Sequence, residues 1–553
     1  MRGARVVPHR PAELPANRNF NLNAQVAANA ANTGLITQFR TFQLQPHQIA
    51  VSQLFVKPST PGLLLYFKVG SGKTLASIAA VENLARVERI RRKVLVIGPA
   101  SLGENYMKEL QNAGVNPDRY EFMSFQKLHS DANKIRKEML ARNPHTDKIV
   151  IRRRMNAMLN AFGQYVYKRV NGINYSRGKV LVIDEVQNVK NPLGEYLTSL
   201  LEVSRTAHKR LLLTGTPVVN YPSDMGAYLG LINPANENIT VRTQVMQEGV
   251  MKDVPAFEKT FGRTAFKRVE ELDALLRCTT LFYEPSAEIQ RMYYPTKTEH
   301  WVDVPLTKEQ MRRHFEIAAE METPRNIDIH NSALEDQKST KAYINAARQI
   351  NNIWGIYHPK IDLVVSAIIN EVKNNNGKCI FYDFFKDSWK TVRDMLRQEP
   401  AIKLATFTGE TKDSERTAIV RDYNTDKINV LLLSAAGGEG LDLKNTTQMH
   451  ILQPWWNEEK INQVIGRAVR YKSHNRGRRH VDVYRYCAVF PPGGDAVKAA
   501  QLPRGTRPAD VGFAYNYTAD EVLKNISVRK AEDNGRFLTR LVRISDENLR
   551  TCM

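Results

Sequence analysis

The segment Leu63–Ser77, which reads LLLYFKVGSGKTLAS, holds residue types that suit phosphate binding. An apolar run predicts a buried strand, and a glycine-rich turn separates it from residues at helical spacing. Backbone N–H groups in such a turn can approach phosphate oxygens near the positive end of the helix. We expect Lys73 to reach the β- and γ-phosphates and Thr74 to bind Mg²⁺. The loop residues that would surround the phosphates are Gly70, Ser71 and Gly72.

A second apolar run, Lys179–Ile183, is followed by two carboxylates. Asp184 would hold Mg²⁺ directly or through water, and Glu185 would orient or deprotonate the water that attacks a phosphate. Acid pairs are common on protein surfaces, but they rarely stand at the end of a buried strand. The position therefore favours hydrolysis of a nucleoside triphosphate.

Polar residues at other places in the first half could complete this site. Gln48 precedes the glycine turn, and its amide suits the edge of an adenine ring, although a lone Gln is usually a surface residue. Thr214 and Thr216 follow the predicted strand Arg210–Leu213. Their hydroxyls would hydrogen-bond the carboxylates and sense the state of the nucleotide.

The second half of the chain offers cationic side chains. Gln463, Arg467 and Arg470 fall on one face of a predicted helix. Two guanidinium groups on one face suit a triphosphate, but pairs of surface arginines are ordinary, so the spacing alone leaves both interpretations open.

Composition narrows the classes of partner. Lys and Arg number 79 against 57 Asp and Glu, so the net charge is +22. This excess predicts a polyanionic partner, nucleic acid before a membrane surface, while a basic enzyme without such a partner is the alternative. No apolar run reaches the roughly 20 residues of a membrane helix, and the N-terminus lacks the apolar region of a secretory signal.

The cysteines are few and scattered. Their spacing resembles neither a metal-ligand set nor a disulfide framework, so we expect neither a metal site nor disulfides. A reducing compartment fits this pattern. They are Cys278, Cys379, Cys487 and Cys552.

Patterning along the chain suggests five regions. Residues 1–43, rich in Asn, Ala and Gln, predict a flexible N-terminal arm. We expect a first ATP-binding lobe over 44–235, a mostly helical connecting region over 236–355, a second lobe over 356–490 and a helical extension over 491–553.

In this order, the motifs resemble those of superfamily 2 helicase-type ATPases, and more narrowly those of the Swi/Snf group. Leu44–Gln48 (LQPHQ) is similar to the opening L-R-P-Y-Q, and Gly98–Leu102 (GPASL) to P-x-S-L. Asp184–Asn191 resembles D-E-A-H-x-x-K-N, Leu213–Asn220 resembles L-T-G-T-P-x-x-N, and Gln463–Arg470 fits Q-x-x-G-R-x-x-R.

A narrower resemblance lies in Gly466–His474, GRAVRYKSH, which is similar to the G-R-x-x-R-x-x-S-H of large cytoplasmic DNA viruses. That group includes the poxvirus nucleoside triphosphatase I and the small subunit of the early transcription factor. One residue departs from the family pattern. Gln187 stands where D-E-x-H has the His that helps to couple hydrolysis to nucleic-acid binding.

The resemblance implies an α/β fold of two RecA-like parallel-sheet lobes, with a helical connecting region and a C-terminal helical extension. ATP and Mg²⁺ would lie in the cleft between the lobes. Arg467 and Arg470 would face the P-loop, which is the glycine turn with Lys73 and Thr74, from the second lobe. Gly440 and Asp442 would also contact the nucleotide.

Further residues are expected to serve nucleic-acid binding and its coupling to hydrolysis. The coupling residues would be Gln187, Thr214, Thr216 and Gln463. DNA, single- or double-stranded, would lie across both lobes, with its phosphates near Pro99, Ala100, Ser101, Leu102, Thr408, Gly409, Ser434 and Gly437.

The implied function is a virion-associated, DNA-dependent ATPase and translocase that serves viral transcription. Its partners would be DNA and the viral RNA polymerase or other transcription proteins, in the virion and the host cytoplasm, without a membrane. Two alternatives remain: a promoter-binding transcription factor whose ATPase is secondary, and a non-enzymatic scaffold. The intact Lys73, Asp184, Glu185, Arg467 and Arg470 argue against the scaffold.

Overall fold

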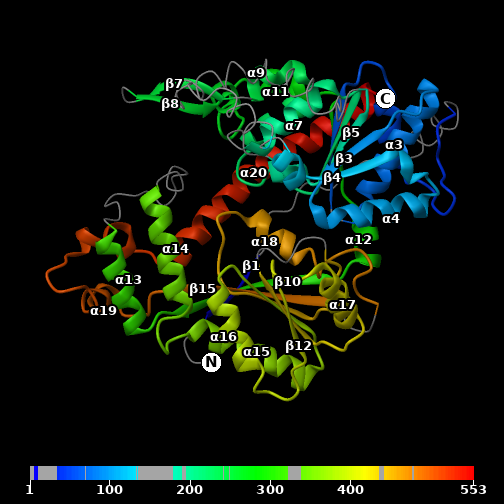
Figure 1. Ribbon diagram of the computed structural model, residues 1–553. Coiled ribbons are helices and arrows are strands. Elements are labelled where there is room, and N and C mark those ends of the chain that lie inside the picture. Colours follow the sequence, from blue (N-terminus) through cyan, green and yellow to red (C-terminus); the bar gives the residue numbers. More distant parts are fainter. Residues whose placement is uncertain are drawn as a thin grey trace. The chain divides into compact units, whose positions relative to one another are not determined.

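The computed structural model divides the chain into two compact units (Figure 1). The P-loop unit comprises Leu14–Ser286 and Asp533–Met553, and the arginine unit comprises Met1–Glu13 and Ala287–Glu532. The structure describes residues 5–9, 34–68, 70–131, 134, 178–189, 195–240, 242–247, 250–321, 338–434, 441–475 and 479–553.

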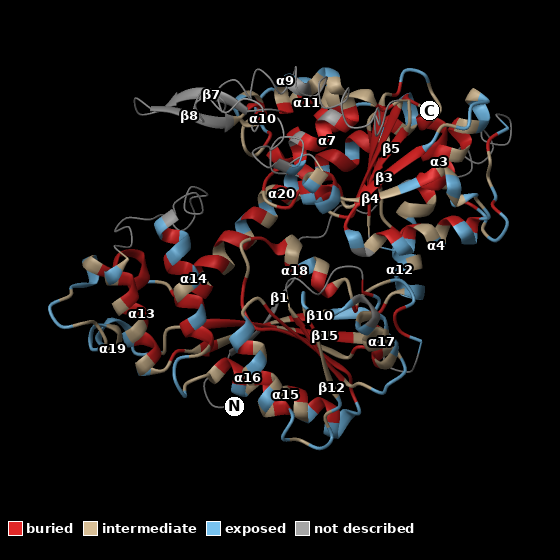
Figure 2. Ribbon diagram, viewed as in Figure 1, coloured by how far each residue is buried: buried red, intermediate tan, exposed pale blue. Residues whose placement is uncertain are grey.

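The P-loop unit is built on a six-stranded sheet in which all neighbouring strands are parallel. Continuous apolar runs predict such strands, because both faces of a parallel sheet are covered by helices. The four inner strands are buried throughout, whereas the edge strand Tyr120–Ser124 is of mixed burial (Figure 2). In spatial order they are β4 (Tyr120–Ser124), β3 (Val94–Gly98), β5 (Val180–Ile183), β6 (Lys209–Thr214), β2 (Gly62–Phe67) and β9 (Thr280–Tyr283).

Alternate residues of these strands enter two separate cores. Leu63 and Leu65 of β2 pack with helices α2 (Pro46–Phe55), α3 (Lys73–Glu88) and α4 (Gly103–Ala113). Leu64 and Tyr66 instead pack with α7 (Glu195–Thr206), α8 (Met225–Ile232) and residues 537–544 of α20 (Ala519–Thr551). The sheet therefore lies between two layers of helices, which fixes the direction of every strand end.

Shorter elements connect this frame. They are η1 (Ala100–Leu102), η2 (Pro117–Arg119), η3 (Val186–Val189), η4 (Pro222–Asp224), η5 (Pro234–Asn236), α9 (Glu237–Thr240), the hairpin β7 (Arg242–Gln247) with β8 (Val250–Pro255), α10 (Ala256–Phe261) and α11 (Val269–Leu276).

The arginine unit holds a seven-stranded sheet that is parallel except for β1 at one edge. The predicted α/β class with two mainly parallel sheets is thereby confirmed. The spatial order is β1 (Arg5–His9), β10 (Thr296–Pro305), β15 (His480–Val489), β14 (Gln448–Ile451), β11 (Cys379–Asp383), β13 (Val430–Ser434) and β12 (Leu404–Phe407).

Helices cover this second sheet in the same manner. Ile380 and Leu431 pack with α17 (Asp413–Asn424) and α18 (Glu458–Ile465), whereas Phe381 and Leu432 pack on the opposite side with α15 (Pro359–Asn375) and α16 (Lys386–Leu396). This unit also contains α12 (Ala287–Tyr293), α13 (Lys308–Glu320), α14 (Lys338–Asn352), α19 (Gly494–Ala499) and η7 (Pro508–Tyr515).

Two regions differ from the sequence-based expectation. In the N-terminal arm, residues 5–9 form β1, and buried Leu35 and Phe39 lie in a stretch whose Ile36 N–H donates to Asn83 Oδ1 at 2.6 Å. In the region 236–355, expected to be mostly helical, β9 extends the first sheet and β10 extends the second. Strand β10 was hidden because its polar Glu299 is buried and pairs with Arg485 at 3.4 Å, which obscures the apolar pattern.

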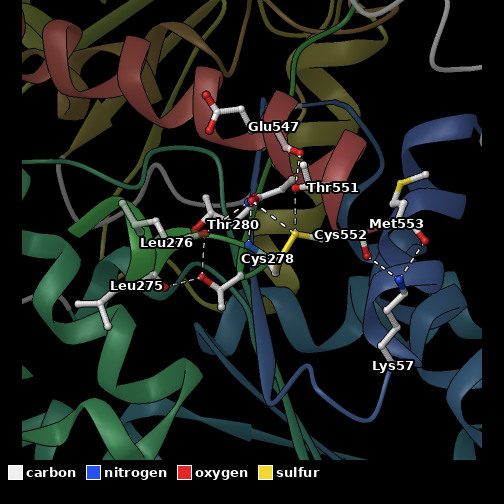
Figure 3. Close-up of a disulfide and its surroundings, with 11 residues drawn as sticks. Lys57, Leu275, Leu276, Cys278, Thr280, Glu547, Thr551, Cys552 and Met553 are labelled. Atoms are coloured by element: carbon white, nitrogen blue, oxygen red, sulfur yellow. Dashed lines mark hydrogen bonds between the residues drawn. A yellow bond between two sulfur atoms is a disulfide. The ribbon is translucent and has the colours of Figure 1, made fainter. Parts of the chain in front are cut away.

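The expectation that the cysteines do not pair is wrong. Cys278, just before β9, and Cys552, just after α20, form a disulfide with Cα atoms 5.6 Å apart (Figure 3). Their separation of 274 residues gives no sequence signal, because only the fold brings them together. Beside the disulfide, Lys57 Nζ donates to the backbone oxygens of Cys552 at 2.7 Å and Met553 at 2.9 Å.

Within the part of the chain that the structure describes, we find no helix that combines the length and the apolar character needed to cross a membrane.

Candidate nucleotide-binding site

The glycine turn after β2 adopts the backbone shape that its sequence requires. Gly70 and Gly72 have φ angles of 83° and 73°, in the left-handed region that glycine enters without steric cost. Gly72 also faces Gln48, whose Nε2 would lie 2.5 Å from a Cβ at that position. Helix α3 begins directly afterwards at Lys73, so its unpaired N–H groups point toward the turn.

The side chains of this loop hold it against β2. Ser71 is buried, and its Oγ donates to Lys68 O. Lys73 Nζ donates to Phe67 O at 3.4 Å, at the end of the strand. Thr74 is half-buried in the first turn of α3. The predicted loop residues thus lie together where a phosphate would meet the helix N-terminus.

Gln48 and its neighbour His47 support the loop from α2. Gln48 is buried, accepts a hydrogen bond from Gln45 N at 2.9 Å and donates one from Nε2 to Gly72 O at 3.3 Å. Its amide has a second N–H that these bonds do not use. Gln48 therefore shapes the P-loop in addition to any contact it makes with a base.

His47 was not identified from the sequence. Its Nε2 lies 2.9 Å from Ser71 O, and its ring stacks on Tyr283 at a centroid distance of 3.5 Å. Because a carbonyl oxygen only accepts, Nε2 carries the proton. Burial lowers the pKa of His47 to about 4, so the ring is neutral near pH 7. The sequence signal that could have identified His47 is its place in LQPHQ, where the similar pattern L-R-P-Y-Q has an aromatic tyrosine.

Asp184 and Glu185 stand where β5 ends. Asp184 is buried against the backbone of Gly98, and its Oδ1 accepts a hydrogen bond from Glu185 N at 2.9 Å. Burial, followed by the charge of Glu185, raises the pKa of Asp184 to about 7, whereas the charge of Lys73 acts in the opposite direction. A cation placed beside this carboxyl group would favour its ionised form.

A chain of hydrogen bonds links Glu185 to the end of β6. Gln187 Nε2 donates to Glu185 Oε2, and Gln187 Oε1 accepts from Thr214 Oγ1 at 2.7 Å. The same Thr214 oxygen accepts from Thr216 N at 2.9 Å. Since β5 and β6 are neighbouring parallel strands, their carboxyl ends lie side by side and make this chain possible.

The three strand ends share one edge of the sheet. Strand β6 lies between β5 and β2, and all three run in the same direction. The P-loop, the carboxylate pair and Thr214 are therefore brought together, although the Thr214 hydroxyl donates to Gln187 and not to a carboxylate as expected. This edge is where α/β sheets bind their ligands.

We expected the two arginines of the arginine unit to lie on a helix, and the structure shows that they do not. Helix α18 contains Gln463 but ends at Ile465, because Gly466 has low helix propensity and turns follow it. Arg467 and Arg470 lie in these turns. The N-terminus of α18 is capped by Asn457, whose side chain accepts from Lys460 N at 3.1 Å.

Arg470 contacts the segment that follows β13. Its Nη1 donates to Leu441 O at 2.9 Å, and its Nε lies 3.6 Å from Asp442 Oδ1. Asp442, which was expected to contact the nucleotide, thus pairs with Arg470. Gly440, expected to do the same, lies outside the described residues.

The expected nucleic-acid contacts follow the carboxyl ends of strands. In the P-loop unit, Pro99 is buried, Ala100 is exposed and Leu102 is half-buried; the structure places the backbone of Ser101 but does not describe its side chain. In the arginine unit, half-buried Thr408 and exposed Gly409 follow β12, and half-buried Ser434 ends β13. Gly437 lies outside the described residues.

Comparison with known proteins now adds to this geometry. The SNF2-related domain matches residues 25–356, and the helicase conserved C-terminal domain matches residues 359–472. A protein of Acanthamoeba polyphaga mimivirus, assigned as an ATP-dependent RNA helicase, is 26% identical over 88% of this chain and 94% of its own length.

Two further proteins are similar to this chain. The nucleoside triphosphatase I of Melanoplus sanguinipes entomopoxvirus is 20% identical over 80% of this chain and 72% of its own length. The SWI2/SNF2 ATPase core of Sulfolobus solfataricus, solved with double-stranded DNA, aligns with 82% of this chain and 90% of that chain, at 20% identity and a TM-score of 0.35.

Proposed function

The chain belongs to the SNF2-related family and is a helicase-type enzyme that hydrolyses ATP, and we propose that it couples this hydrolysis to movement on DNA during viral transcription. The observation that carries the proposal is the series of hydrogen bonds that joins Glu185 through Gln187 to Thr214 beside the P-loop. The net charge of +22 and the viral relatives support a nucleic-acid partner and a viral setting.

The residues of the P-loop unit fit a nucleotide with Mg²⁺. Thr74 and Asp184 would hold the metal ion, which supplies positive charge to the phosphate oxygens. Asp184 suits this role because burial disfavours its charge until a cation lies beside it. Lys73 would move from Phe67 O to the β- and γ-phosphates, and the N–H groups of the turn would bind the remaining oxygens.

Glu185 would orient the attacking water and accept its proton, while Gln187 would couple this step to the rest of the chain. The Gln187 amide donates to Glu185 and accepts from Thr214, so it bonds on two sides as a histidine can. Unlike histidine, an amide does not gain a proton near neutral pH. A shift of Thr214 or Thr216 would therefore reach Glu185 through one side chain at any pH between about 5 and 8.

Arg467 and Arg470 would contribute from the arginine unit when the two units close on ATP. An arginine that reaches the γ-phosphate only in the closed state stabilises charge in the transition state. Closure and reopening would move the nucleic-acid contacts at Pro99–Leu102, Thr408, Gly409 and Ser434 along the strand. Translocation would then need no separation of strands.

The decisive experiment measures ATP turnover by the full chain with single-stranded DNA, duplex DNA and RNA in parallel. We expect stimulation by DNA, and loss of turnover in Lys73→Ala. The matched control is Lys93→Ala, which removes an exposed lysine directly before β3 and away from the turn. Stimulation by RNA alone would instead favour an RNA-dependent enzyme, the activity that the name of the mimivirus relative states. No stimulation by any nucleic acid would contradict the proposal.

A binding measurement at several salt concentrations tests the partner separately. If Z phosphates are neutralised, the logarithm of the binding constant should fall with that of the salt concentration at a slope of about −0.9Z on duplex DNA or about −0.7Z on single strands. Affinity should vary little with sequence. A strong preference for one promoter sequence would favour the transcription-factor alternative, and a flat salt response would exclude phosphate contacts.

A further inference from the structure

Ser473 forms two hydrogen bonds with the backbone of Arg470. Arg470 N donates to Ser473 Oγ at 3.4 Å, and Ser473 N donates to Arg470 O at 3.1 Å. The hydroxyl oxygen also lies 2.8 Å from Ala468 O, within donating distance. Ser473 is 1% exposed, so water does not compete for these bonds.

His474 fastens this turn to the segment after β13. Its Nε2 donates to Thr446 O at 2.7 Å, and its Nδ1 lies 3.0 Å from Ser473 Oγ. Asn445 N donates to Ser473 O at 2.9 Å. The segment held in this way continues from Leu441 and Asp442, which contact the guanidinium of Arg470. Arg470 is therefore fixed to one segment through its backbone and through its side chain.

Arg467 is tied to the same segment, because Leu443 N donates to Arg467 O at 3.2 Å. These bonds fix the backbone of both arginines, and the contacts with Leu441 O and Asp442 also fix the guanidinium of Arg470. Such support matters for a charged group that must meet a phosphate, since a displacement of about 1 Å can cost ~10²-fold in rate.

We propose that Ser473 and His474 are positioning residues that aim Arg470 at the γ-phosphate. The proposal rests on the function proposed above, because it assigns a role only if Arg470 takes part in hydrolysis. It gives a physical reason for the paired Ser and His that follow the arginine motif in the sequence. A merely structural pair would stabilise the turn without a specific effect on Arg470.

The proton count links the two side chains. Thr446 O accepts only, so His474 Nε2 carries a proton, and in the neutral ring Nδ1 then accepts. Burial lowers the pKa of His474, which keeps the neutral ring at pH 7. The single proton of Ser473 can serve Ala468 O or His474 Nδ1, but not both. Removing either side chain therefore alters the bonds of the other.

A double-mutant cycle with Arg470 tests the proposal. We expect Ser473→Ala to lower kcat for ATP by roughly tenfold or more, with KM for ATP nearly unchanged. In an Arg470→Ala background the same change should cost less than about twofold, because the residue that Ser473 aims is absent. Tyr471→Phe, which removes the hydroxyl of an exposed residue within the same turn, is the control and should be silent.

A second pair of variants covers a failure to fold. His474→Gln keeps a donor near Thr446 O and should retain more turnover than His474→Ala at equal thermal stability. Equal losses from Ser473→Ala in both backgrounds, or equal turnover in the two His474 variants, would overturn the proposal. If Arg470→Ala itself leaves turnover unchanged, the role of Arg470 in the proposed function fails, which is a different result.

Discussion

At the scale of single residues, the candidate site depends on side chains that bond in two directions. Gln48 joins the start of α2 to Gly72, and Gln187 joins Glu185 to Thr214. Each amide has both a donor and an acceptor, so it fixes the relative position of two segments. The loss of one such side chain would displace groups that it never touches directly.

Glu185→Gln should separate nucleotide binding from hydrolysis. The substitution keeps the size of the side chain and removes its negative charge, and with it the ability to accept a proton from water. We expect ATP binding close to that of the wild type and a fall in turnover of at least about 10²-fold. Equilibrium binding of ATP and steady-state hydrolysis on the same preparation measure the two quantities. Turnover near the wild-type rate would refute the role of Glu185.

Arg470→Lys should bind ATP almost normally but lose most of the nucleic-acid-stimulated turnover. The guanidinium is planar and contacts Leu441 O and Asp442 at once, a geometry that an ammonium group cannot reproduce. Arginine fingers contribute about 10³–10⁵ in turnover. Turnover assays with saturating nucleic acid, beside ATP binding, test this expectation. If ATP binding is lost as well, Arg470 binds the ground state instead.

His314 should make the free energy of unfolding sensitive to acid. His314 lies on the buried side of α13, and this burial lowers its pKa to about 4. Its bond to Ala514 O and the charge of Asp520 act in the opposite direction. In the unfolded chain its pKa is about 6.5, so neutral His314 contributes stability above that pH and the contribution is lost as the pH falls toward 4.

Within this interval, the free energy of unfolding should fall by up to ~1.4 kcal/mol for each unit by which the pH is lowered. Urea unfolding of the wild type and His314→Gln between about pH 7 and pH 5 measures it, and the stability difference between them should shrink as the pH falls. A difference that stays constant with pH would show that His314 does not remain neutral in the folded protein.

At the scale of elements, the disulfide fastens the end of α20 beside β9. It closes a loop of 274 residues in sequence, so breaking it enlarges the freedom of the unfolded chain. We expect the double substitution Cys278→Ser and Cys552→Ser to lower the free energy of unfolding of the P-loop unit by about 2–4 kcal/mol. Reductant should destabilise the wild type similarly and leave the variant unchanged.

Thiol titration provides the control for that measurement. After denaturation without reductant, only Cys379 and Cys487 should react, and all four cysteines should react after reduction. Four reactive thiols before reduction would contradict the disulfide.

Much of the fold and the site could be predicted from the sequence for a common reason. Buried parallel strands are continuous apolar runs, and the P-loop, the carboxylate pair and Thr214 stand directly after such runs. Strand β10 escaped prediction because Glu299 is buried by pairing with Arg485. The end of α18 escaped because helical spacing continues through Arg470 although the helix does not.

At the scale of the whole molecule, each unit holds part of the proposed machinery, and one helix runs through both. Residues of α20 up to Glu532 belong to the arginine unit, and residues from Asp533 onward belong to the P-loop unit. Near its start, Asp520 is buried and pairs with Lys360 at 2.7 Å. Near its end, Arg540 pairs with Asp273 at 2.6 Å. The helix is thus anchored separately in each unit.

Gly535 lies inside α20, just beyond the boundary between the units. A Cβ at this position would meet no heavy atom within 4 Å, so packing does not require glycine there. Glycine in a helix interior costs about 0.5–1 kcal/mol relative to alanine, because it loses more backbone freedom on folding. We therefore expect Gly535→Ala to raise the free energy of unfolding by about this amount.

Thermal and urea unfolding of the full chain measure this change. Gly226→Ala is the opposite control, because a Cβ there would lie 2.7 Å from the Cβ of Phe257 and should destabilise the protein. A loss of stability in Gly535→Ala would show that the chain departs from a regular helix at this point. ATP turnover of the same variant then has a clear interpretation. A lower rate in a more stable protein would mean that the freedom of α20 at Gly535 serves the catalytic cycle, whereas an unchanged rate would assign the glycine no part in it.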